Sequence, residues 1–283
     1  MGSTRTRPHR GDRYDGHRVE LAQSFNGIFP YLMRGRNESI VYFPMTFDME
    51  NLLAYLDARK GTDQAVTLFE AMMLALIKVL RARPALNRYI IGRRVYQRED
   101  IVLSFVAKRE MSDEGEETNV LVTITPTDDR ATILAKLRGE IRHAKQGDAK
   151  KDDQTIAAFL KLPRWALRAA VGALSLVDFY HDTPGFLRGM DPLRCTAYVA
   201  NLGSVGANAP YHHLFEWGTC SIFIAIGRVG PAVVVGDDNQ PVVRQTVRWR
   251  ISLDERITDG YYDARSLDLI EEFFTHPEML ETV

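Results

Sequence analysis

A compact charged turn near the C-terminus holds the densest group of side chains that could carry chemistry. Asp254, Glu255, Arg256 and Asp259 lie within a stretch of six residues, and Gly260 follows them directly. Carboxylates can exchange protons with a substrate, and a guanidinium can hold an anionic group. Glycine permits a positive φ or a close approach of the backbone. The composition of this turn therefore indicates acid–base chemistry.

Two regular elements flank the turn. Before it, apolar and polar residues alternate over residues 243–251, which predicts a strand. After it, helical spacing predicts an amphipathic helix with the apolar residues Ala264, Leu267, Ile270, Phe273 and Phe274. A side chain held between a strand and a helix is fixed rigidly, as catalysis requires.

Two adjacent histidines form a second group of candidates. Only histidine has an unperturbed pKa near neutrality, so His212 or His213 could serve as a base in a cleft, although satisfied structural histidines are the other interpretation. Successive side chains diverge and no third ligand is apparent, so we expect no metal site. Metal-dependent hydrolysis that adds Glu216 and Glu255 is the least favoured hypothesis, because helical His-x-x-x-His spacing is absent.

The charged turn resembles a signature of known acyltransferases. Asp254, Arg256, Asp259 and Gly260 match the Asp-His-Arg-x-x-Asp-Gly of the catalytic domain of 2-oxoacid dehydrogenase acyltransferases (E2), and more distantly the His-x-x-x-Asp-Gly of chloramphenicol acetyltransferase. In that family the histidine is the general base that takes a proton from the thiol of coenzyme A or dihydrolipoamide. Glu255 stands in its place here.

Other segments follow the family in the same order, from about residue 25 to about residue 280. The stretch Asn201, Leu202 and Gly203, after a predicted strand, resembles the family's Ile-Ser-Asn-Leu-Gly. Ala200 lies where that strand usually carries a serine or threonine that helps stabilise the oxyanion. The resemblance implies an α/β fold, a two-layer sandwich with a mixed β-sheet, of the chloramphenicol acetyltransferase-like (CoA-dependent acyltransferase) type.

The resemblance also implies partners and a substrate. Family members are trimers with active sites in channels between subunits, so we expect a homotrimer that binds coenzyme A or acyl-CoA. Arg34 and Arg36 are either solvated residues or, in the sharper interpretation, one of them pairs with Asp259. By the resemblance, Glu255 and Asp259 would face the Asn201 and Ser221 region of a neighbouring subunit. The expected catalytic residues are Glu255, Asp259, His212 and His213, and the expected substrate-binding residues are Asn201, Gly203, Ser221 and Arg36.

Two hypotheses of function follow from the altered motif. The first is an acyltransferase that uses Glu255 or a histidine as base. A glutamate is a poor base for a thiol unless burial raises its pKa, so the expected acceptor is an alcohol or amine already activated by another group and not dihydrolipoamide. The second is a non-catalytic trimeric scaffold or ligand-binding pseudo-enzyme, because a base and an oxyanion-stabilising hydroxyl are both replaced.

Composition excludes some broad classes. The chain has 283 residues and a formal net charge of -1, so no general attraction to nucleic acid is expected. Two cysteines without metal-ligand spacing indicate a reduced, cytoplasmic protein without a disulfide. Residues 1–20, rich in basic side chains, would form a flexible tail without features of a signal peptide, and 21–283 a single acyltransferase-like domain.

An apolar segment at residues 156–187 interrupts the family pattern. We expect one or two helices there, packed on the sheet or on a neighbouring subunit. The alternative is a lid over an acyl-chain pocket or a contact with a membrane surface. Elsewhere Thr67 and Glu70 fit a capping box, and Asp48 is a candidate N-cap. Further strands are expected at residues 40–45, 89–91, 94–96, 101–107, 119–124, 196–200 and 222–227.

Overall fold

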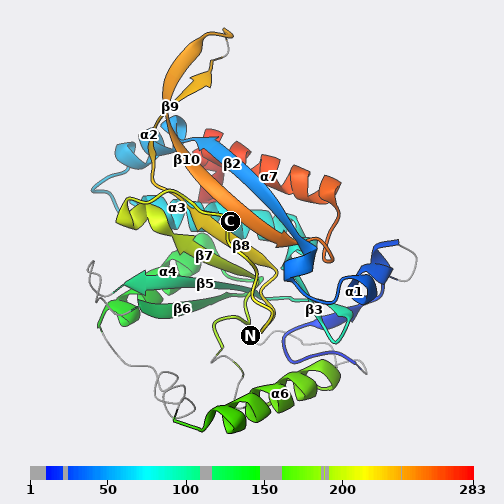
Figure 1. The fold of residues 1–283 in the computed structure, drawn as a ribbon. Coiled ribbons are helices and arrows are strands. Elements are labelled where there is room, and N and C mark those ends of the chain that lie inside the picture. The colour runs from blue at the N-terminus through cyan, green and yellow to red at the C-terminus, as the bar shows by residue number, and fades with distance from the viewer. Residues whose placement is uncertain are drawn as a thin grey trace.

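A mixed β-sheet forms the centre of the computed structural model (Figure 1). Its strands lie in the order β2, β10, β8, β7, β5 and β6, and β9 pairs with the first half of β10. Strand β7 is parallel to both β5 and β8, and the other pairs are antiparallel. The bounds are β2 Ile40–Asp48, β5 Ile101–Lys108, β6 Glu117–Ile124, β7 Ala197–Asn201, β8 Ile222–Ile226, β9 Gly230–Val235 and β10 Pro241–Asp254.

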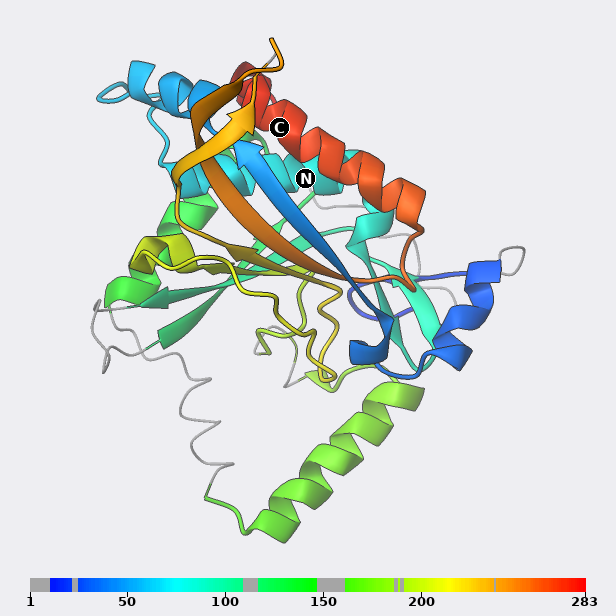
Figure 2. The ribbon, with the colours of Figure 1, turned by 45° about the horizontal axis from the view of Figure 1, so that its top comes forward.

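The structure describes residues 11–21, 25–108, 117–146, 161–185, 188, 191–236 and 238–283. Four helices cover one face of the sheet (Figures 1 and 2), and their apolar side chains form the main core with the strands beneath them. They are α2 Glu50–Ala58, α3 Leu68–Ala82, α4 Arg130–Gln146 and α7 Gly260–Thr275. Shorter turns of helix are α1 Phe29–Leu32 and the 3-10 segments Phe25–Ile28, Asn37–Ser39, Pro84–Asn87, Leu202–Val205 and Pro277–Glu281. The expected α/β two-layer sandwich is thus confirmed.

Local sequence signals account for the helix starts. The capping box of α3 is present: the Thr67 side chain accepts a hydrogen bond from the Glu70 N–H, and the Glu70 carboxylate accepts one from the Thr67 N–H. Asp48 is not the N-cap of α2 as expected, because Met49 occupies that position. The Asp48 carboxylate nevertheless accepts the Glu50 N–H at 2.9 Å, which satisfies one of the free donors of the first turn.

Among the described residues, loops and the short 3-10 segment Leu202–Val205 cover the second face of the sheet. A smaller apolar cluster forms there from Cys195, Tyr198, Leu214, Cys220, Phe223 and Ala225. Both cysteines are buried free thiols. The segment at residues 206–219 crosses this face and carries His212 and His213 over the middle of the sheet.

A small antiparallel sheet corrects the boundary expected at residue 20. Strand β1 (His17–Val19) pairs with β4 (Arg94–Gln97), which pairs with β3 (Arg88–Ile91). Arg13 is buried and forms an ion pair with Asp178 at 2.5 Å. Residues 13–19 therefore belong to the folded body, because backbone pairing and a buried ion pair hold them. Residues 1–10 lie outside the described residues.

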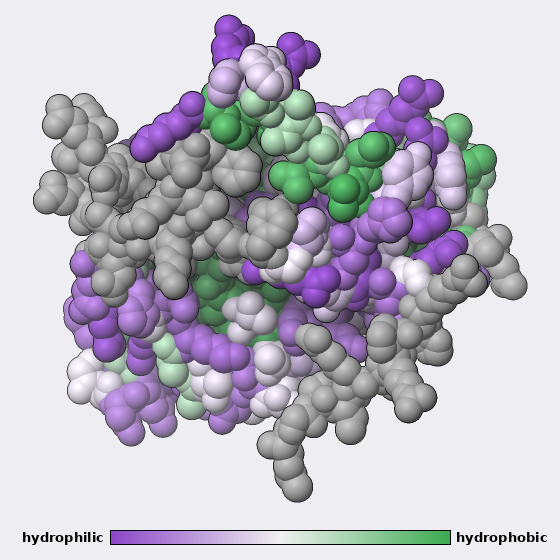
Figure 3. All heavy atoms as spheres, turned by 90° about the horizontal axis from the view of Figure 1, so that it is seen from below, coloured by the Kyte–Doolittle hydropathy of each residue, from purple (hydrophilic) through white to green (hydrophobic). Residues whose placement is uncertain are grey.

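The helix expected in the apolar segment is present as α6 (Arg164–Tyr180), while residues 156–160, 186, 187 of that segment lie outside the described residues. It does not pack on the central sheet: Figures 1 and 2 both show most of its length apart from that sheet and its covering helices, while its C-terminal end contacts the turn between β3 and β4. Viewed from that side, Figure 3 shows exposed hydrophobic side chains among hydrophilic ones. Large exposed apolar residues on α6 are Trp165, Val171, Leu176, Val177, Phe179 and Tyr180.

None of the helices among the described residues is both long and apolar enough to cross a bilayer.

Candidate functional site

The charged turn is clamped by a buried ion pair. Asp254 is fully buried at the end of β10, and its two carboxylate oxygens accept hydrogen bonds from Nε and Nη2 of Arg256 at 2.8 and 2.7 Å. The third guanidinium nitrogen of Arg256 donates to the carbonyl of Met33 at 3.0 Å. The pair therefore fixes the turn to the segment that follows α1, and it has a structural role.

Asp259 caps a helix. Its carboxylate accepts the N–H of Tyr262 at 2.9 Å and so begins α7. The expected pairing of Arg36 with Asp259 is wrong, because the buried Arg36 guanidinium donates instead to the carbonyls of Ile90 and Glu216, at 2.8 and 2.7 Å. Among the described residues, Arg34 makes no ion pair with Asp259 either. An N-cap carboxylate already has a partner in the backbone, so it needs no arginine.

Glu255 lies between these two fixed residues. Its backbone N–H donates to the carbonyl of Ser39 at 2.9 Å, and the residue is half-buried. Within the described part of the chain its carboxylate has no hydrogen bond or ion pair. A carboxylate on a rigid backbone that has no internal partner remains free to accept a proton from a ligand.

The two histidines are held by their own backbone. His212 stacks on Phe223 with ring centroids 3.8 Å apart, and its Nδ1 lies 2.7 Å from the carbonyl of His213. Nδ1 of His213 lies 2.9 Å from the carbonyl of Leu214. A carbonyl only accepts hydrogen bonds, so each Nδ1 carries the proton and each Nε2 keeps its lone pair. Both rings therefore have the tautomer that a base requires.

The remaining expected site residues lie at two opposite ends of the sheet. The carbonyl of Ser221 accepts the N–H of Asp254 at 3.0 Å, so Ser221 is beside the charged turn of its own chain. Asn201 is opposite Ile226, whereas Ile222 is opposite Leu253 at the other end of β8. Four residues of strand span roughly 13 Å. One chain therefore brings Ser221 to the turn and keeps Asn201 away from it.

Gly203 and Ala200 accompany Asn201 at that far end. A Cβ on Gly203 would lie 2.6 Å from the carbonyl of Gly227, so only glycine fits this close approach of two backbones. Ala200 is half-buried on β7 and packs against the cluster beneath the histidine segment.

Asp263 is a candidate that the sequence did not indicate. It is buried in the first turn of α7, where burial raises the pKa of its carboxyl to about 6. The hydroxyl of Thr258 donates a hydrogen bond to it at 2.6 Å and opposes this rise. Asp259 and Glu255 add like charge nearby and raise the pKa further. The sequence shows the Asp-Gly-x-x-Asp spacing at residues 259–263, but it does not show that the side chain of Asp263 is buried on α7.

Replacing Asp263 with asparagine should change how stability depends on pH. The raised pKa means that the folded state favours the protonated carboxyl, so the contribution of this group is full below its ordinary pKa of 3.8 and is lost as the pH rises through about 6. The Asp263→Asn variant should gain up to about 2–3 kcal/mol over the wild type between about pH 4 and about pH 8. Urea unfolding across this range measures the difference, and a constant difference would contradict it.

The described residues contain no group of three or more histidine, cysteine, aspartate or glutamate side chains that could hold a metal ion.

Comparison with known proteins identifies the fold. No protein-family model and no curated protein sequence matches the chain. A probable dihydrolipoamide acetyltransferase from Listeria monocytogenes superposes with a TM-score of 0.57 and 16% identity, over 95% of this chain and 96% of that chain. The E2p dihydrolipoamide acetyltransferase of Azotobacter vinelandii gives 0.57 and 14%, over 90% and 87%. A chloramphenicol acetyltransferase gives 0.53 and 11%, over 92% and 99%. The acyltransferase-like fold expected from the motif is confirmed.

Proposed function

We propose that this chain is a CoA-dependent acyltransferase-like protein that binds an acyl thioester in a channel between the subunits of a homotrimer. Glu255, His212 and His213 are the candidate bases, and Asn201 and Gly203 line the channel from the other subunit. If Glu255 is the base, the acceptor is an alcohol or amine that another group has already activated, since a glutamate without a raised pKa is a weak base for a thiol. The two free thiols accord with a cytoplasmic location.

The separation of the two ends of β8 carries this proposal. Glu255 and Asn201 lie at opposite ends of the sheet, so a single chain cannot bring both to the same reacting bond of a ligand. A second copy that places its Asn201 end against the Glu255 turn would complete the site. This arrangement agrees with the location of the active site that the motif implies, between subunits.

The hairpin of β9 and β10 offers a surface for this assembly. It projects beyond the body of the molecule (Figure 1), and its outer face exposes Val233, Val235 and Val243 at 71%, 75% and 64%. Val233 is paired directly with Val243, so the three form one apolar face. A two-stranded hairpin alone is only marginally stable in water, and packing of this face against a second copy would stabilise it.

A charge on this face should prevent assembly. In a single chain Val233 is exposed, so the Val233→Lys variant should fold normally, whereas burial of an unpaired ammonium in the trimer costs several kcal/mol. Sedimentation velocity should show a trimer for the wild type and a monomer for Val233→Lys. Gln240→Lys, in the polar turn of the same hairpin, is the matched control and should remain trimeric. A monomeric wild type, or a trimeric Val233→Lys variant, would contradict this arrangement.

Binding of acyl thioesters tests the function itself. Calorimetric titration of the purified protein with coenzyme A, acetyl-CoA and longer acyl-CoAs should give saturable binding that strengthens with chain length, because each buried methylene adds about 0.8 kcal/mol. If no member of the series binds, the result would contradict the proposal that this protein binds an acyl thioester.

A second candidate function is a trimeric scaffold that has lost the chemistry. Two replacements favour it: Glu255 stands where the family has its histidine, and Ala200 has no hydroxyl at its position on β7. Each of the two missing groups typically supplies a factor of about a hundred or more in rate. Trimer formation without release of coenzyme A from any acyl-CoA, in the presence of a range of alcohols and amines, is the result that would favour the scaffold.

A further inference from the structure

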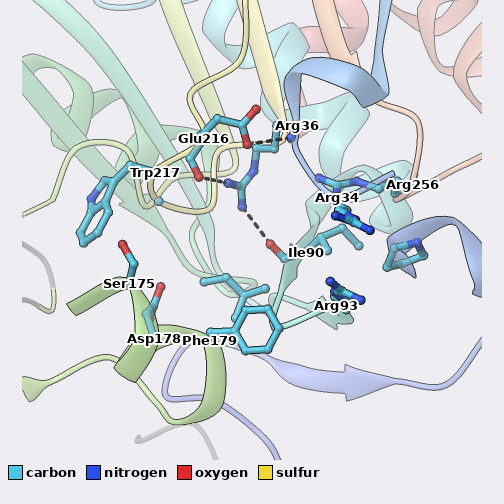
Figure 4. A pocket seen from close by; sticks show the side chains of 14 residues that line it. Arg34, Arg36, Ile90, Arg93, Ser175, Asp178, Phe179, Glu216, Trp217 and Arg256 are labelled. Carbon is cyan, nitrogen blue, oxygen red and sulfur yellow. Dashed lines mark hydrogen bonds between the residues drawn. The ribbon is translucent and has the colours of Figure 1, made fainter. Parts of the chain in front are cut away.

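A pocket of about 310 Å³ lies between α6 and the body of the protein. It is lined by the segment at residues 30–36, by the turn between β3 and β4, by the last turns of α6 and by residues 216–218 (Figure 4). This volume is at the lower end of the range for small-molecule sites. Helix α6 therefore completes a pocket that the sheet and its covering helices do not form by themselves.

The α6 wall of the pocket is fixed to the body. Asp178, near the end of the helix, accepts hydrogen bonds from Arg13, Arg194 and Thr183 at 2.5, 2.8 and 3.0 Å. On the turn between β3 and β4, a Cβ on Gly92 would lie 2.3 Å from the carbonyl of Phe179, and its φ is +57°. This contact requires glycine, and it seats the end of α6 directly on the backbone of the turn.

The lining carries an excess of positive charge. Arg34, Arg36, Arg93 and Arg256 face two carboxylates, those of Asp178 and Glu216 (Figure 4). Arg256 is neutralised by Asp254, and Asp178 is bound by Arg13 and Arg194. The remaining groups are three guanidinium cations and the Glu216 carboxylate. Three positive charges and one negative charge leave a net charge of +2.

None of these three guanidinium groups forms a hydrogen bond with a carboxylate among the described residues. Arg36 is only 5% exposed, and desolvation lowers its pKa. Its guanidinium binds backbone carbonyls and no carboxylate, and its buried Nε has no hydrogen-bond partner within the described residues. The side chains of Arg34 and Arg93 are exposed and make no hydrogen bond or ion pair with the described residues. A buried guanidinium without a directly bonded carboxylate is incompletely compensated, and an anionic ligand in contact with it would add to the compensation from Asp254.

We propose that this pocket binds a phosphate monoester through Arg34, Arg36 and Arg93. A phosphate monoester carries a charge of about -1.5 to -2 at neutral pH, which matches the excess charge of the lining, and planar guanidinium groups bind its oxygens in pairs. The aromatic rings of Phe179 and Trp217 provide an apolar wall for the organic part of the ligand. This inference does not depend on acyl transfer, because the pocket contains neither Glu255 nor Asn201.

Calorimetric titration at physiological salt tests the pocket with phenyl phosphate, inorganic phosphate and acetate. The wild type should bind phenyl phosphate more tightly than inorganic phosphate, and acetate least. The double variant Arg34→Gln/Arg93→Gln should lose at least about tenfold in affinity for both phosphates with an unchanged Tm, since neither side chain bonds to any of the described residues. The matched control Arg142→Gln/Arg265→Gln removes the same charge from the exposed surfaces of α4 and α7 and should bind as the wild type does.

Vesicles of phosphatidylcholine with and without phosphatidic acid identify the source of the phosphate. If the monoester belongs to a lipid, the wild type should sediment with the vesicles that contain phosphatidic acid and not with those of phosphatidylcholine only. The double variant should sediment with neither. If it belongs to a soluble molecule, the titrations above should show binding without sedimentation. The proposal is overturned by an absence of binding in both experiments, or by equal binding of the wild type and the double variant.

Discussion

The Asp254→Ala variant should be less stable than the wild type by about 3–5 kcal/mol. Asp254 is completely buried and Arg256 is 3% exposed, so removal of the carboxylate leaves a buried guanidinium whose main partner is gone. Arg36, which is also buried, feels the charge of Asp254 and would lose that compensation as well. This cost is a large share of the stability of an ordinary domain.

Urea unfolding measures this effect, and a double-mutant cycle isolates the pair. Arg256→Met should be costly alone, and the double variant Asp254→Ala/Arg256→Met should cost less than the sum of the two. Asp268→Ala is the control, because its ion pair with Arg265 is exposed and should contribute no more than about 0.5 kcal/mol. Additive losses at Asp254 and Arg256 would show that the buried pair does not stabilise the turn.

Substitution of the base should lower turnover of an acyl-CoA by about a hundredfold or more. We expect this loss in Glu255→Gln, His212→Asn or His213→Asn, whichever residue takes the proton, while the affinity for acyl-CoA stays within about twofold. Release of free coenzyme A thiol in the presence of alcohols and amines is the rate to measure. The fold should tolerate Glu255→Gln, because the described residues make no bond to its carboxylate.

The Glu255→His variant is the positive control for this series, since it restores the motif of the family. It should raise the rate of transfer to a thiol acceptor if the end of β10 holds its side chain in the channel. Unchanged rates in all three base variants would contradict the assignment of the base to these residues. An absence of turnover in the wild type, with acyl-CoA still bound, would leave the trimeric scaffold as the function.

Local patterns in the sequence predicted most of the sheet and its helices. The alternation at residues 243–251 lies within β10, and the capping box of Thr67 and Glu70 begins α3 as expected. These features depend on residues that are close together in the sequence. Alternation of apolar and polar residues predicts a strand with one buried face, and a capping box predicts where a helix begins. The resemblance of the charged turn to the acyltransferase signature, together with the matching order of the other segments, predicted the fold.

Contacts between distant parts of the chain were not predictable in this way. Arg36 was expected beside Asp259, but it lies among carbonyls of residues 90, 215 and 216, since a buried arginine binds whichever acceptors the fold brings to it. The raised pKa of Asp263 likewise depends on the burial of its side chain in the first turn of α7, and the neighbouring residues in the sequence do not reveal this burial.

The sequence by itself therefore determined the fold of this protein and the candidate bases Glu255, His212 and His213, because both depend on residue types at fixed spacing. Only the tertiary structure decided which charges are paired. It buried Asp254 with Arg256, assigned Asp259 to the cap of α7, and left Arg34, Arg36 and Arg93 without carboxylate partners among the described residues. Ion pairs form over a few ångströms between segments remote in the chain, and their strength depends on burial, so they follow from packing and not from spacing.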